Sequence, residues 1–468
     1  MIITFIINFN FSFLIYTFAI NNQYHKGNTI KSLILSAVAA MAITTTLSAD
    51  ELSDLKTQLK ILSERLSTLE ANANKQAEQT NTLTSELINV QNQTSFTTID
   101  EDKAIQGMSP AASKVYYSKN PLSIGGYGEL YYSNYEDSVG TGSTKQNYGD
   151  TYRFIPYIGY KFSDNIILNS ELEFEHGNEV AVEQLYVDFV LDPLATIRVG
   201  HQLIPMGYVN LYHEPTLFNT VQRPDVEKHL IPSTWHELGI SVYGKTDTFE
   251  YQIGTFTALD MSNATTGTPV STKDWIRKAR VGNESDNTST GMDNMAVVSR
   301  LDYNGINGLQ IGISGYTGKA GNAIIAGKSE EGQMSMMDIH ASYQNEGFKA
   351  RALYTQSHLS HADSYKTDMP ESAQGAYVNL EYNVLPYFTQ TGNRLPLFFQ
   401  YERYNLASNM VDGGSFGTTE SFTYGLNYFP HDQVVLKAEY MLRNNKNTAT
   451  SSSYVDEGIY SFGLGFIF

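Results

Sequence analysis

The sequence predicts an all-β fold, a 16-stranded antiparallel transmembrane β-barrel that follows an N-terminal α-helical coiled coil. Three observations support this fold class. Segments of alternating apolar and polar residues, each long enough for a tilted strand to cross a bilayer, recur from Leu122 onward. Short turns and longer loops alternate between these segments, as they do when both chain ends of a barrel lie on the same side. A run of leucines at heptad spacing precedes the barrel.

The composition excludes several other classes of protein. The chain has 468 residues, a formal net charge of −18 and a mean hydropathy of −0.29, which is too polar for a bundle of membrane-spanning helices. In a transmembrane β-barrel, apolar residues alternate with polar ones along each strand, so the mean hydropathy stays low. The value found here is therefore compatible with a barrel. The acidic total disfavours nucleic acid as a partner, because phosphate contacts need clustered Lys and Arg. The absence of cysteine excludes disulfides and thiolate chemistry.

Residues 1–49 are predicted to be a secretory signal peptide. Lys26 and Lys31 precede an apolar stretch that ends in small residues before Asp50, which is the layout of such a signal. An earlier uncharged stretch, residues 1–20, is unusual for a signal peptide. We therefore predict that translation begins near Ile30 and that the first ~29 residues precede the true start of the protein. An uncleaved anchor helix is the alternative.

Residues 50–95 are predicted to form a periplasmic coiled coil. Leucines occupy successive a and d positions of the heptad, at Leu52, Leu55, Leu59, Leu62, Leu66 and Leu69. One narrow apolar seam is typical of a coiled coil, whereas a helix packed on a globular core has a wider apolar stripe. A single solvated amphipathic helix is the alternative. Residues 96–121 are predicted to be a linker to the barrel at 122–468.

Sixteen alternating segments make up the predicted barrel, which is wide enough to hold an aqueous channel. They centre on Leu130, Phe154, Leu172, Val187, Val199, Ile240, Ile253, Val297, Ile311, Ile339, Ala350, Val378, Phe399, Tyr424, Leu436 and Leu464. The last segment, 460–468, has a large apolar side chain at every even position. It resembles the final strand of bacterial outer-membrane proteins, whose terminal aromatic residue is recognised by the barrel-assembly machinery. The corresponding residue of this chain is Phe468. A soluble strand that ends in Phe is the alternative.

Alternation within the strands also predicts which residues face the lumen. A charge that faces lipid near the middle of the membrane costs a few kcal/mol, so the polar set must face inward. The residues predicted to line the pore are Glu129, Arg153, Glu171, Glu173, Arg198, Arg300, Asp338, Arg351, Glu381 and Lys437. Over all strands, the inward positions hold eleven acidic and seven basic residues. This net-acidic lining predicts a modest preference for cations.

Several stretches carry a resemblance to a known family. They are residues 123–132 (SIGGYGELYY) and 198–207 (RVGHQLIPMG), followed by Arg223-Pro224, 231–235 (IPSTW) and 237–239 (ELG). Together they resemble the phosphate-selective porin O and P family over about residues 110–468, and the leucine heptads match members with an N-terminal coiled coil. The resemblance implies a homotrimeric, sixteen-stranded porin whose third external loop folds into the lumen.

The third long connection, residues 207–236, is predicted to be this constriction loop. The residues expected to form the constriction are His213, Glu214, Arg223, Asp225, Glu227 and Lys228. These three acids face two bases and a histidine, so the charge of the constriction is expected to be nearly balanced. An ordinary external loop is the alternative.

The resemblance and the polar lumen predict a porin in the outer membrane of a Gram-negative bacterium. Small hydrophilic solutes and ions are expected to diffuse through it passively and with weak selectivity. The mixed lining is the reason why the phosphate selectivity of the family is not carried over. Expected partners are two further copies of the chain, outer-membrane lipid and lipopolysaccharide. The alternative is a structural or adhesive surface protein whose coiled coil braces the envelope.

No enzymatic activity, cofactor or metal site is predicted. The sequence shows no nucleophile motif and no Gly-rich phosphate loop. His358 and His361 have a spacing found in metal sites, but they fall in a predicted loop. The basic segment 274–280 in the fourth long loop is predicted either to attract anions or lipopolysaccharide phosphates, or to be a solvated run of charges.

Overall fold

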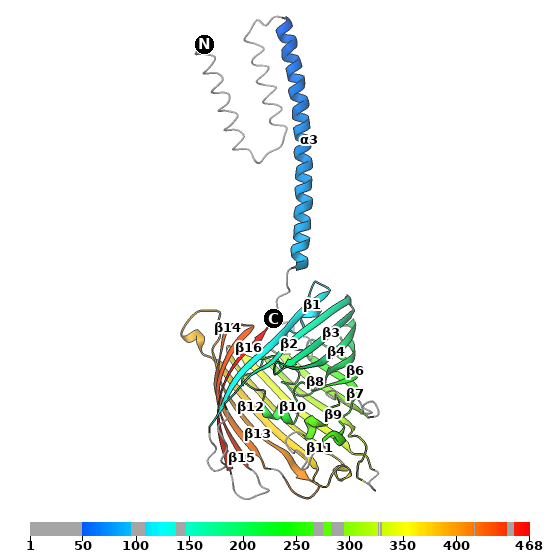
Figure 1. The fold of residues 1–468 in the computed structure, drawn as a ribbon, viewed down its shortest axis with the longest axis vertical. Helices are drawn as coiled ribbons and strands as arrows, with labels where there is room; N and C mark the ends of the chain where they lie inside the picture. The colour runs from blue at the N-terminus through cyan, green and yellow to red at the C-terminus, as the bar shows by residue number, and fades with distance from the viewer. Residues whose placement is uncertain are drawn as a thin grey trace. The chain divides into compact units, whose positions relative to one another are not determined.

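The computed structural model describes residues 49–94, 108–136, 147–264, 275–281, 294–325, 327, 330–415, 417–446 and 454–468 (Figure 1). Nearly all of the predicted signal peptide lies outside these residues. The chain divides into two units, residues 1–95 and 96–468, and each is described by itself.

The first unit contains the long helix α3, which spans Ala49–Thr94. Its sequence has the heptad leucines but neither Pro nor Gly, so nothing interrupts the helix. Leu62 and Leu69 are each 63% exposed. A coiled coil would bury such a seam between copies of the chain, and that assembly remains a prediction. Among the described residues, no helix is both long and apolar enough to cross a membrane.

Deleting residues 50–95 is expected to leave a barrel that inserts and conducts but whose oligomer dissociates at a lower temperature. Burying leucine seams between copies would add association energy to that of the barrel contacts. Electrophoresis of heated samples measures the dissociation temperature. Leu62→Ser with Leu69→Ser should reproduce the decrease, whereas Lys60→Ser with Lys75→Ser, off the seam, should not. An unchanged temperature would show that the segment has another role.

The second unit is a closed antiparallel barrel of sixteen strands (Figure 1). Each strand pairs with its neighbours in sequence, and β1 pairs with β16. The strands are β1 (Leu122–Tyr135), β2 (Asn147–Ser163), β3 (Ile166–Glu175), β4 (Glu179–Asp192), β5 (Ala195–Leu203), β6 (His236–Lys245), β7 (Phe249–Thr257), β8 (Met295–Ile306), β9 (Leu309–Lys319), β10 (Gln333–Asn345), β11 (Phe348–Leu359), β12 (Pro370–Asn383), β13 (Pro396–Met410), β14 (Thr419–His431), β15 (Val434–Lys446) and β16 (Tyr454–Ile467). Each predicted strand centre lies in the corresponding strand, so the predicted fold class is confirmed.

The barrel closes where the last residue of the chain meets β1. The Gly126 amide donates to the Phe468 carbonyl at 3.0 Å, and the Phe468 amide donates to the Gly126 carbonyl at 2.9 Å. A Cβ atom on Gly126 would lie 2.7 Å from the Phe468 ring, so only glycine leaves room for that ring. The ring stacks on Phe154, with centroids 6.0 Å apart. Phe468 therefore covers the seam between β1 and β16.

Side chains along each strand point alternately to the outside and to the inside of the barrel. In β8, exposed and buried residues alternate without a break from 295 to 302. Val297 and Leu301 point outward, while Arg300 and Asp302 are buried inside. This alternation is the structural counterpart of an apolar exterior around a polar lumen.

One connection differs from the expected pattern of long loops at one end of the barrel. β3 and β4 are joined by only three residues, 176–178. His176 and Gly177 adopt left-handed backbone conformations, with φ of 53° and 75°. Two such residues in succession reverse the chain directly, so a hairpin replaces the expected loop.

Residues 108–121, within the predicted linker, lie inside the barrel next to β1. They include the short helix α4 (Lys114–Tyr117). Met108, Ala111 and Val115 are at most 2% exposed. The Asn169 side chain donates to the Ala112 carbonyl at 3.0 Å. This part of the chain therefore belongs structurally to the barrel interior.

Candidate functional site

The connection between β5 and β6, residues 204–235, turns back into the barrel, and we call it loop L3. It contains the short helix α5 (Asp225–His229). The Gly207 amide donates to Asp338 on β10 at 3.0 Å. Further along the loop, the Val221 amide donates to Glu439 on β15 at 2.8 Å. Because these strands stand well apart around the barrel, L3 crosses the lumen.

Glu227 holds the two halves of L3 together. Its carboxylate accepts the amides of Tyr208 at 2.7 Å, Val209 at 2.6 Å and Asn210 at 3.2 Å. It also accepts the Tyr377 hydroxyl at 2.6 Å. Burial raises the pKa of Glu227, and these hydrogen bonds oppose the rise. Glu227 is fully buried, so its carboxylate stabilises the fold of the loop from inside.

The start of L3 is fixed by a buried ionic network on β8 and β10. Arg300 pairs with Asp302 at 2.6 Å and donates to the Gly207 carbonyl at 2.5 Å. The ring of His340 lies 2.7 Å from both Asp302 and Asp338. The sequence did not single out His340 as a site residue. Its inward parity, two residues after Asp338, is the feature that could have identified it. Arg300 and Asp338 therefore serve to anchor L3.

His213 and Glu214 lie against the opposite wall. His213 contacts Glu171 on β3 at 3.3 Å, and Glu214 accepts the Ala111 amide at 3.0 Å. Burial, assisted by the charge of Arg223, lowers the pKa of His213 to about 4, so its ring is neutral at pH 7.

The tip of L3 carries the remaining predicted constriction residues. Arg223 is 5% exposed and donates to the Tyr127 hydroxyl at 3.3 Å. Asp225 pairs with Arg443 on β15 at 2.8 Å. Burial alone would raise the pKa of Asp225, but Arg443 and neighbouring cations lower it to about 2. Of the six predicted constriction residues, Lys228 keeps the most solvent contact.

Most basic side chains in the lumen have a partner. Arg198 pairs with Asp188 at 2.8 Å, and Arg153 pairs with Glu175 at 2.8 Å. Lys437 donates to the carbonyl groups of two L3 residues, at 2.8 Å and 2.9 Å. These cations are neutralised or hold the loop, and they form no continuous ladder of unpaired charge.

Arg351 differs from Arg153, Arg198 and Arg300 because it has no carboxylate partner among the described residues. Its guanidinium lies over the ring of Tyr208 in L3, 4.7 Å from the centroid. Within the part of the chain that the structure describes, its Nε has no hydrogen-bond partner, and neither does the Glu129 Oε1. Both side chains are buried, at 6% and 5% exposure.

Partly exposed lumen-facing side chains gather at two ends of the barrel. At the end with the short turns they are Ser342, Lys349 and Glu381, with Tyr208 and Tyr212 of L3. At the other end they are Tyr131, Tyr152, Glu173 and Arg443, with Lys228 and His229 of L3. Solvent thus enters the lumen from both ends, and the buried part of L3 separates the two entrances. This position is the one expected of a constriction, and the role of L3 as the constriction remains a prediction.

The fourth long connection packs onto L3 rather than presenting a basic surface. Trp275 and Ile276 of α7 (Trp275–Lys278) are at most 1% exposed and belong to a large apolar cluster with Trp235. The Trp275 indole donates to the Leu406 carbonyl at 2.7 Å. Burial lowers the pKa of Arg280 to about 10. The segment is therefore largely interior, which argues against a solvated run of charges.

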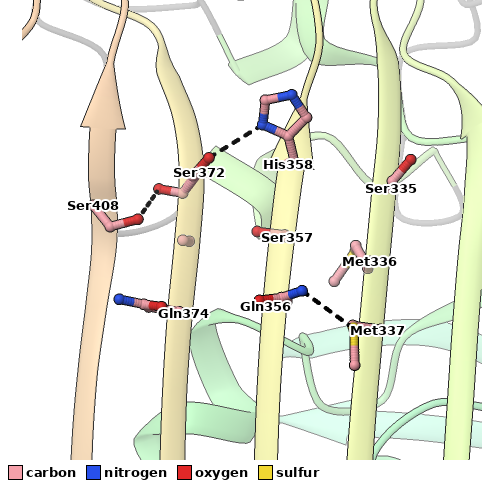
Figure 2. Close-up of a pocket in the computed structure, with 10 residues that line it drawn as sticks. Ser335, Met336, Met337, Gln356, Ser357, His358, Ser372, Gln374 and Ser408 are labelled. Carbon is pink, nitrogen blue, oxygen red and sulfur yellow. Dashed lines mark hydrogen bonds between the residues drawn. The ribbon is translucent and has the colours of Figure 1, made fainter.

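One described groove lies on the outer wall of the barrel. It has a volume of about 440 Å³ and crosses β10 to β13 (Figure 2). Gln356 and His358 line it from outward positions of β11, and His358 contacts the Ser372 hydroxyl at 3.2 Å. His361 instead contacts Glu330 at 2.7 Å. The two histidines therefore have separate partners.

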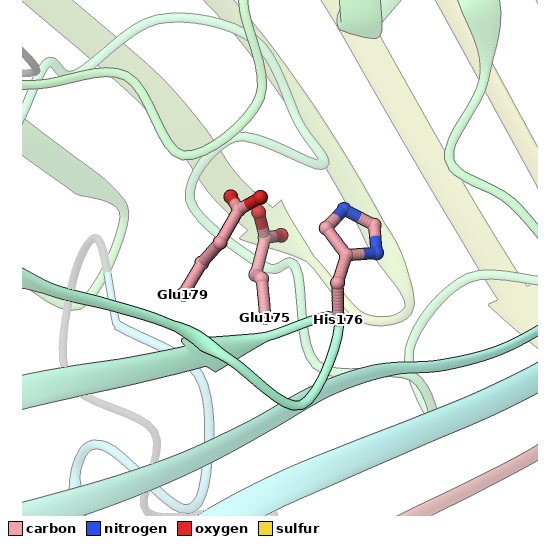
Figure 3. A group of neighbouring side chains, drawn as sticks. All are labelled: Glu175, His176 and Glu179. Atoms are coloured by element: carbon pink, nitrogen blue, oxygen red, sulfur yellow. The ribbon is translucent and has the colours of Figure 1, made fainter.

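One group at the tip of the β3–β4 hairpin brings ligand-type atoms together. Oxygen and nitrogen atoms of Glu175, His176 and Glu179 lie within 4.8 Å of one another (Figure 3). Glu175 is already paired with Arg153, and His176 with Asp150 at 2.5 Å. The group gives this end of the barrel an acidic rim.

Comparisons with known proteins agree with this architecture. A family model described as "Phosphate-selective porin O and P" matches residues 149–468. An uncharacterized protein of Aquifex aeolicus (strain VF5) is 32% identical over 378 residues, covering 75% of this chain and 82% of that protein. Among solved structures, an anion-selective porin from Comamonas acidovorans has a TM-score of 0.50 at 14% identity and covers 74% of this chain and 99% of its own. The outer membrane channel DcaP of Acinetobacter baumannii has a TM-score of 0.49 at 8% identity, with 74% and 97% coverage.

Proposed function

Because the chain belongs to the phosphate-selective porin O and P family, we propose that it is a narrow outer-membrane channel for small hydrophilic solutes and ions, with weak selectivity for cations. The family and the barrel indicate a channel rather than an enzyme. The observation that carries the proposed selectivity is the pairing of three of the four arginines predicted to line the pore. Arg198 and Arg300 each have a carboxylate partner within 3 Å, and so does Arg153.

Pairing matters because a permeating anion is attracted only by charge that is not already neutralised. Binding phosphate selectively needs several cations whose donors are free to replace the hydration shell of the ion. The partly exposed ionic groups at the two entrances include Glu173 and Glu381 as well as Lys349 and Arg443. Arg443 is paired with Asp225, which leaves Lys349 and Lys228 as the basic groups at the entrances. Glu173 and Glu381, together with the exposed Glu179 of the β3–β4 hairpin, outnumber them by one, so the remaining field slightly favours cations.

A salt gradient across a planar bilayer is expected to give a reversal potential that indicates modest cation preference. Glu173→Gln with Glu381→Gln should reduce this preference, because it removes the two entrance carboxylates. Lys349→Met is the matched control, because it removes a positive charge from an entrance, and it should increase the cation preference. Added phosphate should block only weakly. A clear anion preference with tight phosphate block would overturn the proposed selectivity.

The proposed assembly is a homotrimer. In planar bilayers, each inserted particle should then open in three equal conductance steps. A barrel that never conducts would overturn the channel function itself, whatever its oligomeric state.

A further inference from the structure

We propose that residues 108–118 form a plug inside the lumen that clamps L3 in place and thereby limits the width of the pore. This inference rests on the proposed channel function. We call this segment the lumenal plug. It precedes β1 in sequence and would otherwise be a connection outside the barrel.

Side chains of the wall hold the plug through hydrogen bonds. The Tyr116 hydroxyl donates to Asp188 at 2.7 Å, beside the Arg198 ion pair. Lys161 donates to the carbonyls of Tyr116 and Ser118, at 3.0 Å and 2.7 Å. Arg198 also donates to the Tyr116 hydroxyl at 3.4 Å. Strands β2, β4 and β5 therefore each supply a charged side chain that contacts the plug.

The wall is also shaped to receive it. A Cβ atom on Gly159 of β2 would lie 2.5 Å from the Cβ of Val115. A Cβ on Gly125 of β1 would lie 3.1 Å from the Ala111 carbonyl oxygen. Strand interiors seldom contain glycine, unless a backbone or side chain approaches closely. The plug approaches closely at both positions, and at Gly125 the Phe468 carbonyl oxygen does so as well, 3.0 Å from the same Cβ position.

The plug meets L3 at Glu214. Both oxygens of this carboxylate accept the Ala111 amide, at 3.0 Å and 3.2 Å, and Oε1 also accepts the Ala112 amide at 3.2 Å. The Ser109 hydroxyl adds a bond to the Leu211 carbonyl at 3.3 Å. Charge-assisted bonds from two consecutive amides fix the position of L3 relative to the wall. Glu214 is fully buried, so releasing the plug would leave its charge without these donors and would free this part of the loop.

The first test compares Glu214→Ala with Glu214→Gln by single-channel conductance in planar bilayers. Alanine removes the acceptor, so L3 should move and the conductance should rise roughly twofold, with frequent partial closures. Glutamine keeps an acceptor at Oε1 and should stay close to the wild-type value. Equal conductance for all three proteins would overturn the inference.

The second test acts on the plug itself. Gly159→Ala places a methyl group where Val115 packs and should displace the plug, raising the conductance. Adding Val115→Gly makes room for that methyl group and should return the conductance toward that of the wild type. Heat-modifiable mobility on gels establishes that each variant has a folded barrel. A folded Gly159→Ala variant with wild-type conductance would contradict the proposal.

The two proposals fail in different ways. A wild-type protein that does not conduct would overturn the channel function. A conducting wild type whose conductance is insensitive to the plug variants would leave the channel intact and overturn the plug.

Discussion

Arg300→Met is expected to destabilise the folded barrel by about 3–5 kcal/mol and to release the start of L3. The side chain of Arg300 is 1% exposed and that of its partner Asp302 is 2% exposed. Removing the cation leaves a buried carboxylate without its main partner, and breaking such a pair costs far more than the pair contributes to stability. The Gly207 carbonyl also loses its 2.5 Å hydrogen bond, so the loop loses an anchor.

A double variant separates these two effects. Arg300→Met with Asp302→Leu removes both charges and should recover much of the lost stability, whereas the conductance should remain altered because Gly207 is still unanchored. Urea unfolding of detergent-solubilised protein measures the first quantity, and bilayer recordings measure the second. Lys319→Met breaks a solvent-exposed ion pair with Glu331 and is the matched control, with an expected cost of at most about 1 kcal/mol. If Arg300→Met cost no more than this control, Arg300 would not be an anchor.

Phe468→Ala is expected to remove most of the folded protein from the outer membrane. The Phe468 ring covers the seam between β1 and β16 and stacks on Phe154. Phe468 is also the residue that the barrel-assembly machinery is proposed to recognise. The amount of heat-modifiable barrel in outer-membrane fractions measures the loss.

Refolding in detergent distinguishes the two roles of Phe468. If recognition dominates, the purified Phe468→Ala chain should refold in detergent nearly as well as the wild type. If seam closure dominates, refolding should fail there too. Phe462→Ala removes an outward ring that is 55% exposed on the same strand, and should affect neither measurement strongly. A normal amount of Phe468→Ala barrel in cells would contradict both roles.

The sequence alone determined the number and order of the strands and the alternation between the two faces of the wall. This was possible because strand geometry repeats every two residues, so a local pattern such as that of residues 295–302 reports both structure and face. The helix over Ala49–Thr94 follows from an equally local seven-residue period. The family resemblance added the expectation that the third long loop folds into the lumen, which no sequence period predicts.

Only the tertiary structure decided what the charged residues do. Parity placed Arg198 and Asp188 in the lumen, but their pairing depends on the register between β4 and β5. Glu214 lies far from Ala111 in sequence, and nothing local indicates that they meet. Contacts of this kind depend on the path of an irregular loop and on close packing, which no short stretch of sequence encodes. The periodic part of the chain is therefore predictable from its residues, while the width and charge of the pore emerge only when the whole barrel has closed around L3 and the plug.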